Sequence, residues 1–404
     1  GFVWSGVYYE RIRLRNFLRS SLTATIAIDF AADYRDIFEI RGDSRPRRGV
    51  LEQARADGNS VVLGYEGLDR VTRTTRIVAD PRPSTISDSE MRFQVELGAG
   101  EERTLTLTAS CRTGPESSES AEYDAALKSS NTALEKTGDI WGRVVTSNHQ
   151  FNRWLDRSRA DLNMMLTETG HGLFPYAGVP WFSTPFGRDG LITALECLWT
   201  APAIARGVLS YLAATQAADV SAEQDSEPGK ILHETRSGEM AALKEVPFGR
   251  YYGSVDSTPL FVMLAGAYYR RTGDLKFISS IWHNIDLALQ WVDKYGDPDR
   301  DGFVEYHRKS AQGLVQQGWK DSQDSIFHKD GRLAEGPIAL CEVQGYVFAA
   351  KLGAADLALR LGHKQQADDL RAQASRLKER FDERFWCEEI GSYGLALDGD
   401  KRLC

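Results

Sequence analysis

Residues 276–295 read KFISSIWHNIDLALQWVDKY. Within this stretch, apolar side chains recur three and four positions apart, at Ile278, Ile281, Ile285, Ala288 and Val292. This spacing places them on one face of an α-helix, because such a helix completes a turn every 3.6 residues. A helix with one apolar face must bury it against another element, so the stretch predicts a helix within a helical layer.

The same period continues on both sides of this stretch. We expect helices over residues 148–168, 189–199, 201–217, 257–272, 276–295, 336–361 and 364–386. Some of the connections are short, whereas the others are long loops rich in Gly, Pro and aromatic residues, at 169–188, 218–256 and 296–335. Long loops without secondary structure are usually functional. Helix pairs joined in this way predict a toroid of helical hairpins with a site at one end.

The first part of the chain, to about residue 112, has a period of two instead. Apolar residues alternate with polar ones at residues 22–30, 91–97 and 104–108. Alternation places one face of a strand on a core and the other in water. Several strands without intervening helices predict an antiparallel β-sandwich. We therefore predict a β-sandwich domain at 1–115, a partly helical linker at 116–146 and a helical domain at 147–404.

Composition excludes several classes of protein. Hydrophobic residues make up 42% and charged residues 26% of the 404 residues, which suits a globular chain with a large core. No apolar run approaches the roughly 18 residues of a membrane helix, so we expect no membrane association. The net charge of -8 argues against nucleic acid as a partner and favours a neutral or polar small molecule.

The five cysteines form no CxxC pair. This argues against a zinc site and against a disulfide framework, and it suits a reducing compartment, so we expect a cytoplasmic protein. The chain contains no P-loop, GxSxG or HExxH motif, and we expect no cofactor. The chain begins with Gly1 rather than Met, from which we expect a fragment of a longer protein.

An aromatic-rich loop at 174–190 leads into one of the predicted helices. Its side chains Trp181 and Phe182 can pack on sugar rings, and Arg188 and Asp189 can hydrogen-bond sugar hydroxyls. The alternative is that Arg188 and Asp189 only begin the helix, with Asp189 at its positive end.

A second loop carries Asp321 between Trp319 and hydroxyl side chains. A carboxyl beside an aromatic wall can lose its water, which raises its pKa and suits a general acid. The alternatives are a solvated loop carboxylate, or Asp324 in place of Asp321.

Two further polar segments lie in the long loops. Residues 297–305 open like a calcium-binding EF-hand loop, but Arg308 occupies the twelfth position, so we interpret the segment as a carboxylate-rich turn and expect no metal. The other segment contains His233 and Glu234, and Tyr252 and Asp256 follow it. A lone His is more often structural than catalytic.

Together these segments resemble bacterial proteins of the glycogen debranching (amylo-alpha-1,6-glucosidase) family. The matching segments occur in the family's order, at Phe186–Gly190, Gly229–Arg236, Ser254–Asp256, Asp301–Gly302, Gly318–Ser322 and Cys341–Gly345. The strand-rich front also looks like the β-domain of these proteins, at Leu14–Phe17 and Asp36–Gly42. The resemblance covers essentially the whole chain.

The resemblance implies an (α/α)6 toroid of the six-hairpin glycosidase type, as in glucoamylase-like and trehalase-like enzymes, and an inverting mechanism with two carboxylates. Asp321 matches the family's general acid, and Arg188 and Asp189 match the pair that holds the terminal glucose hydroxyls. We therefore predict Asp321 as catalytic, and the following residues as substrate-binding: Trp181, Phe182, Arg188, Asp189, His233, Glu234, Tyr252, Asp256 and Trp319.

The complete toroid of the family has twelve helices, of which we predict seven here. The family's general base lies near the last of them. We therefore expect an incomplete toroid, with the base outside this chain and the fragment inactive by itself. Glu342 is expected to be a buried helix carboxylate that orients the loop of Asp321, rather than the base.

The predicted function is hydrolysis of α-glucosidic bonds in an α-glucan or oligosaccharide, at the α-1,6 branch-point linkage of glycogen-like substrates. One alternative is a glucoamylase-like or trehalase-like exo-glycosidase of another linkage. A second is a non-catalytic carbohydrate-binding protein on the same scaffold. The sequence predicts no oligomeric state.

Overall fold

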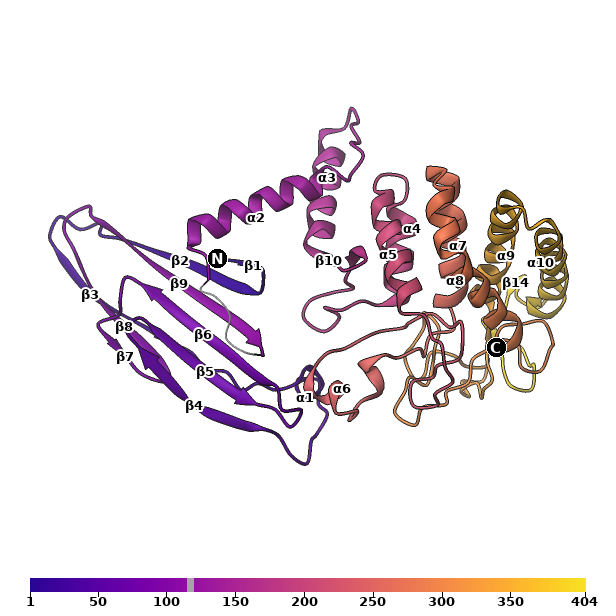
Figure 1. Cartoon of the computed structure of the whole chain (residues 1–404), viewed down its shortest axis with the longest axis horizontal. Helices are drawn as coiled ribbons and strands as arrows, with labels where there is room; N and C mark the ends of the chain where they lie inside the picture. The colour runs from indigo at the N-terminus through magenta and orange to yellow at the C-terminus, as the bar shows by residue number, and fades with distance from the viewer. Residues whose placement is uncertain (115–119) are drawn as a thin grey trace. The chain divides into compact units, whose positions relative to one another are not determined.

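The computed structural model describes residues 1–114 and 120–404 (Figure 1). They form two compact units. The sheet unit comprises residues 1–137 and 238–243, and the helical unit comprises 138–237 and 244–404. The predicted boundary between the β-sandwich domain and the linker, at residues 115 and 116, lies outside the described residues.

The described part of the sheet unit contains nine strands in two antiparallel sheets. The larger sheet has the order β1-β2-β9-β6-β5-β4 and the smaller one the order β3-β8-β7. The strands are β1 (Phe2–Trp4), β2 (Val7–Arg15), β3 (Leu22–Asp29), β4 (Val50–Asp57), β5 (Ser60–Glu66), β6 (Thr72–Asp80), β7 (Thr85–Ile86), β8 (Glu90–Leu97) and β9 (Glu102–Thr113).

The core of this unit lies between the two sheets. Alternate residues of β8 are buried, at Met91, Phe93, Val95 and Leu97. They share one apolar cluster with residues of the larger sheet, namely Val61, Ile77, Ala79 and Leu105. Alternate residues of the strand thus face the core, as the two-residue period predicted, and the N-terminal β-sandwich is confirmed.

Three helices complete the sheet unit: α1 (Ile37–Ile40), α2 (Tyr123–Gly138), which ends at the unit's border, and α6 (Glu239–Ala242). The buried carboxylate of Glu239 accepts hydrogen bonds from the Tyr65 hydroxyl and the Leu68 N–H, each at 2.8 Å. The short segment around α6 therefore packs with the sheet unit, although in sequence it lies between α5 and α7 of the helical unit.

The helical unit has seven long helices among the described residues, as predicted. They are α3 (His149–Met165), α4 (Gly187–Cys197), α5 (Pro202–Ala214), α7 (Ser257–Thr272), α8 (Leu275–Lys294), α9 (Cys341–Leu361) and α10 (Lys364–Phe385). Short elements accompany them: β10 (Leu166–Thr169), β11 (Gly172–Pro175), η1 (Pro247–Gly249), β12 (Ala339–Leu340), β13 (Trp386–Cys387), β14 (Ser392–Tyr393) and β15 (Ala396–Leu397).

The helix predicted from residue 336 begins five residues later, at Cys341. Pro337 lies in the predicted first turn, and the two residues before α9 form β12, which pairs with β15. A residue that precedes proline is disfavoured in the helical region. Local sequence did not reveal the pairing, since the partner strand lies far along the chain.

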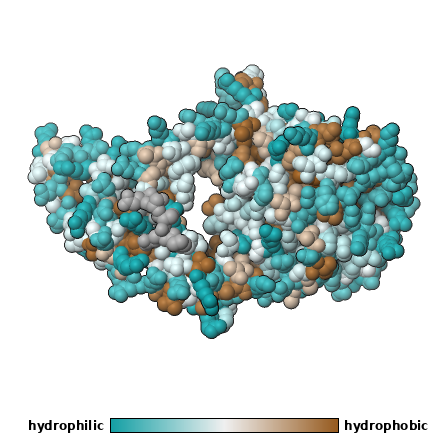
Figure 2. Space-filling view, viewed as in Figure 1, coloured by the Kyte–Doolittle hydropathy of each residue, from teal (hydrophilic) through white to brown (hydrophobic). Residues whose placement is uncertain are grey.

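The apolar stripe of α8 is buried in the core of the helical unit. Its five predicted residues are at most 6% exposed. Four of them, Ile278, Ile281, Ile285 and Ala288, join one cluster with residues of α4, α5, α7, α9 and α10, whereas Val292 joins a second cluster with residues of α9 and α10. Figure 1 shows the long loops gathered at one end of these helices. Figure 2 shows hydrophobic residues scattered among hydrophilic ones on the face of this unit that it draws. None of the described helices combines the length and apolar character needed to cross a membrane.

Two glycines in helices provide a test of this packing. A Cβ on buried Gly207 of α5 would overlap the carbonyl oxygen of Leu173 in β11, whereas a Cβ on exposed Gly345 of α9 would meet no atom within 4 Å. We expect Gly207→Ala to destabilise the fold by about 1–3 kcal/mol, as overpacking does. Gly345→Ala should stabilise it by up to about 1 kcal/mol. Thermal or urea unfolding would check both, and equal effects would contradict the close approach of α5 and β11.

Candidate active site

Backbone hydrogen bonds join the three long loops of the helical unit. The Gly187 N–H donates to the His233 carbonyl at 2.7 Å, and the Val255 N–H donates to the Gln317 carbonyl at 2.9 Å. Isolated bridges also pair Glu234 with Phe186 and with Tyr251. Loops predicted from separate parts of the sequence therefore meet in one place.

Arg188 stands at the centre of this place, in the first turn of α4. Its side chain is 5% exposed, and its Nε donates to Oδ2 of Asp256 at 2.7 Å. Its Nη1 lies 3.6 Å from Oδ2 of Asp321. Burial disfavours the charge, but the surrounding carboxylates outweigh burial and raise the pKa of Arg188. Arg188 therefore joins the start of α4 to two other loops.

The start of α4 can lie this close because residue 187 is a glycine. A Cβ at Gly187 would overlap the carbonyl oxygen of Leu232. The helix has no side-chain cap hydrogen bond at its N-terminus, where Phe186 occupies the cap position. Gly187 thus allows the backbone of α4 to lie close to the backbone at Leu232.

Asp256 is the main ionic partner of Arg188. It is 1% exposed and also accepts a hydrogen bond from the Ser254 hydroxyl at 2.5 Å. It occupies the N-cap position of α7 without capping that helix through its side chain. The sequence suggested Arg188 and Asp189 as a pair, whereas the ion pairs of Arg188 run to Asp256 and Asp321.

Two further carboxyls lie around this arginine. Burial raises the pKa of Asp189, against the effect of Arg188, and burial likewise raises the pKa of Glu342 in the first turn of α9. Glu342 lies against the loop of Asp321, since its Oε1 is 3.9 Å from where a Cβ on Gly318 would stand. Desolvation thus favours the protonated form of both carboxyls.

Tyr346 was not among the predicted residues, yet it belongs to the same surroundings. Burial raises the pKa of its hydroxyl, and the charges of Asp256 and Glu342 raise it further. Tyr346 follows Glu342 by four positions on α9, so the two side chains lie on one face of the helix. That spacing is the signal in the sequence that could have found it.

Asp321 is more open than expected. Its side chain is 50% exposed, and Trp319 is 66% exposed. The indole therefore does not enclose this carboxyl as the sequence suggested, because both side chains turn toward solvent. Asp324, the competing candidate, is exposed as well.

His233 and Glu234 are buried beside the cluster. The imidazole packs edge-on against Phe186 and Tyr251. Burial lowers the pKa of His233 well below its usual value, and nearby cations, Arg188 first among them, add to this, so the ring is neutral. Glu234 accepts a hydrogen bond from Nε of Arg236 at 2.8 Å.

The structure does not bring the remaining predicted residues to the same point. Tyr252 is 4% exposed, and its hydroxyl donates to the Thr215 carbonyl, so its side chain lies in the core. Phe182 is exposed and contacts Phe186 edge to face. The carbonyl of half-buried Trp181 accepts a hydrogen bond from Arg236.

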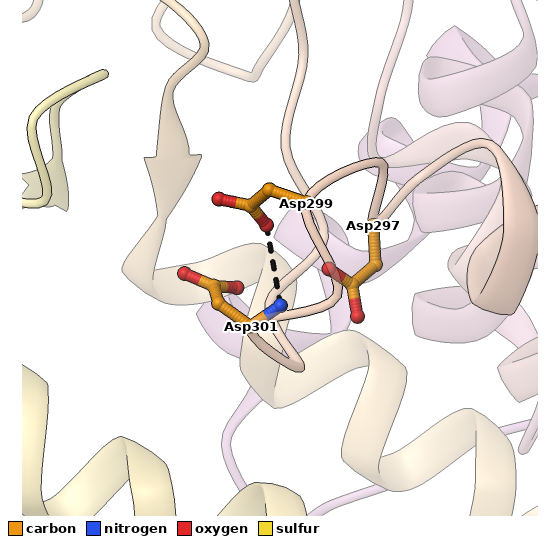
Figure 3. A group of neighbouring side chains, drawn as sticks. All are labelled: Asp297, Asp299 and Asp301. Atoms are coloured by element: carbon orange, nitrogen blue, oxygen red, sulfur yellow. Dashed lines mark hydrogen bonds between the residues drawn. The ribbon is translucent and has the colours of Figure 1, made fainter.

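The carboxylate-rich turn is a separate cluster (Figure 3). Carboxylate oxygens of Asp297, Asp299 and Asp301 lie within 4.8 Å of one another. Asp299 accepts a hydrogen bond from the Asp301 N–H at 3.2 Å. The ammonium of Lys401 lies 2.9 Å from Asp299 and 2.7 Å from Asp301. Backbone N–H groups and a lysine thus engage these carboxylates, as in a turn of this composition.

The raised pKa of Glu342 predicts a pH effect on stability. Its unfolded pKa is near 4.5, and the folded state holds the proton more tightly. Stability should therefore fall as the pH rises from about 4.5 through the raised pKa, and stay lower above it. Glu342→Gln should remove this loss and stabilise the protein by on the order of 1 kcal/mol at neutral pH, but not at about pH 4.

Thermal unfolding at both pH values measures this difference. Glu379→Gln, on the exposed face of α10, is the matched control, and we expect it to show no such pH dependence. If stability depended on pH in the same way in wild type and in Glu342→Gln, the raised pKa of Glu342 would be refuted.

Two family models match the chain. Residues 2–108 match the N-terminal domain of some glycogen debranching enzymes, and residues 210–399 match the bacterial alpha-L-rhamnosidase six-hairpin glycosidase domain. No curated protein matches the sequence.

Among solved structures, the chain is similar to a candidate kojibiose phosphorylase from the human microbiome, with 12% identity and a TM-score of 0.48 over 97% of this chain and 53% of that one. It is also similar to a GH78 family rhamnosidase of Bacillus sp. GL1, with 15% identity and a TM-score of 0.47 over 89% and 35%. The chain thus spans about half the length of the first of these proteins and about a third of the second. The front of the chain is thus similar to a domain of glycogen debranching enzymes, and much of its helical unit is similar to a six-hairpin glycosidase domain.

Proposed function

We propose that the protein hydrolyses α-glucosidic bonds in α-glucans, at the α-1,6 branch-point linkage, by an inverting acid/base mechanism. The observation that carries the proposal is the meeting of Arg188, Asp256 and Asp321 at one end of the helices, with Asp189 and Glu342 close by. The match to the N-terminal domain of some glycogen debranching enzymes supports the choice of substrate.

In this proposal Asp321 is the general acid. It lies in a loop two residues after Trp319, and both side chains are exposed. A sugar that stacks on the indole would displace water from around the carboxyl. The proton would then pass to the glycosidic oxygen as the bond to the leaving sugar breaks.

Arg188 and Asp189 are proposed to hold sugar hydroxyls. Nη2 of Arg188 is buried and has no hydrogen-bond partner among the described residues. An unpaired buried donor is unfavourable, so an acceptor such as a hydroxyl oxygen would be bound there with a gain. Asp256 keeps the guanidinium in place by its 2.7 Å hydrogen bond from Nε.

An inverting enzyme needs a second carboxylate about 6.5–9.5 Å from the acid, with a water molecule between that base and the sugar. The base must be ionised at the working pH. Burial raises the pKa of Asp189 and of Glu342, and we propose neither of them as the base.

Sugar release by the full-length gene product tests the proposal. We expect glucose from a branched α-glucan and, by NMR, a product anomer opposite to that of the bond cleaved. Release from linear malto-oligosaccharides or trehalose alone would point to an exo-glycosidase of another linkage. Release from an aryl α-L-rhamnoside alone would rule out the glucan. Binding of glucan without release would identify a carbohydrate-binding protein.

A further inference from the structure

Asp225 is a buried carboxylate in the loop between α5 and α7, and it lies outside the cluster around Arg188. It is 1% exposed. Its Oδ1 accepts hydrogen bonds from the N–H groups of Lys309 and Ser310, at 2.7 and 3.1 Å. Its Oδ2 accepts hydrogen bonds from the Tyr251 hydroxyl at 2.8 Å and from Nε2 of Gln317 at 3.2 Å. Four donors therefore converge on one side chain, three of them from the loop between α8 and α9.

The backbone around Asp225 is shaped to allow this convergence. Its φ is +49°, a left-handed conformation that few residues other than Gly adopt, and Asp tolerates it better than most. Its carbonyl accepts a hydrogen bond from the buried ammonium of Lys230 at 2.8 Å. A Cβ on Gly313 would stand 2.8 Å from Oδ2 of Asp225, so only a glycine fits there without displacement. The close packing leaves the carboxylate little freedom to move.

Gln317 connects this carboxylate to the proposed acid. It is 1% exposed and precedes Asp321 by four residues. Its carbonyl accepts the hydrogen bond from Val255, the residue before Asp256. The side chain of Gln317 thus reaches Asp225, while its backbone is joined to the segment that carries the main partner of Arg188.

We infer that Asp225 is a positioning residue, which acts through Gln317 to hold Asp321 and Asp256 at their separation from Arg188. The inference rests on the proposed function for the role of Asp321. A general acid must lie within hydrogen-bond reach of the oxygen that it protonates, and a displacement of about 1 Å can lower a rate about 10²-fold. Trp319 and Asp321 are exposed, so their placement depends on the buried residues before them.

Gln317→Leu in the full-length gene product tests this inference, because it removes the link to Asp225 and retains the approximate size of the side chain. We expect kcat for oligosaccharide hydrolysis to fall by about 10- to 100-fold, with KM little changed. Hydrolysis of α-glucosyl fluoride should change by less than about threefold, because fluoride leaves with less help from an acid. Equal losses on both substrates would overturn the inference.

Two further variants separate positioning from general damage. Gln216→Leu removes hydrogen bonds to the Gly229 and Asn284 carbonyls and is the matched control, for which we expect no difference between the two substrates. Asp225→Asn should act like Gln317→Leu, and the double variant should lose about as much as either single one, because both break the same connection. Additive losses would show that Asp225 does not act through Gln317.

Hydrogen exchange gives a readout that does not depend on activity. Backbone amides of residues 318–325 should exchange faster in Gln317→Leu than in wild type, with unchanged exchange in α8. Absence of sugar release by wild type would refute the proposed function by itself. The exchange result would still decide whether Asp225 holds the segment, and unchanged exchange at 318–325 would overturn that role.

Discussion

Asp321→Asn should remove most glycoside hydrolysis by the full-length gene product, while sugar binding stays largely intact. The substitution deletes a proton donor at almost constant shape, and general acid catalysis contributes about 10²–10⁴-fold to a rate. An asparagine can still present its amide oxygen to Nη1 of Arg188, which lies 3.6 Å from the carboxylate now. We therefore expect a loss in kcat, measured by sugar release, with a smaller change in KM.

The matched control is Asp324→Asn in the same loop. Both carboxyls are exposed and belong to one short segment, so a general effect of lost charge would appear in both variants. We expect Asp324→Asn to retain activity. A large loss in Asp324→Asn together with an active Asp321→Asn would move the acid to Asp324.

The second large effect is expected from Arg188→Ala. It would leave Asp256, 1% exposed, without its cationic partner. Removing one member of a buried ion pair destabilises a protein by about 3–5 kcal/mol, because the remaining charge stays uncompensated. We also expect catalytic efficiency to fall strongly, since sugar hydroxyls and Asp321 would lose the same guanidinium. Urea unfolding and kcat/KM measure the two effects.

Arg206→Ala is the control for the stability measurement. Arg206 pairs with Asp274 at 2.6 Å, but its side chain is 54% exposed. Its removal should therefore lower the free energy of unfolding by at most about 1 kcal/mol. Arg188→Lys keeps the charge and should fold if Arg188→Ala does not. Unchanged catalytic efficiency in the lysine and alanine variants would reduce Arg188 to a residue that begins α4.

The helices were predictable because their signal is local. The stripe of α8 repeats within a few turns, and the residues named from it are buried. The start of α9 was not predictable to the same degree. The two residues before it, which were predicted to be helical, pair as β12 with β15, and this pairing depends on a strand much later in the chain.

The candidate site shows the same limit. Arg188 and Asp321 were named from their motifs, and the structure places them 3.6 Å apart. Tyr252 was named for the same reason, but its hydroxyl bonds to the Thr215 carbonyl in the core. A sequence motif shows which residue types are present, whereas the direction in which each side chain points depends on the residues that pack around it.

The sequence by itself determined the two kinds of unit, a β-sandwich followed by amphipathic helices, and the loops in which polar and aromatic groups gather. These features depend on the spacing of neighbouring residues, and that spacing is set along the chain. Only the tertiary structure decided that Asp256 is the main partner of Arg188, that Trp319 leaves Asp321 open to solvent, and that Asp225 ties distant loops together. Such contacts join residues far apart in sequence, and burial sets their strength, so they exist only once the loops have folded against one another.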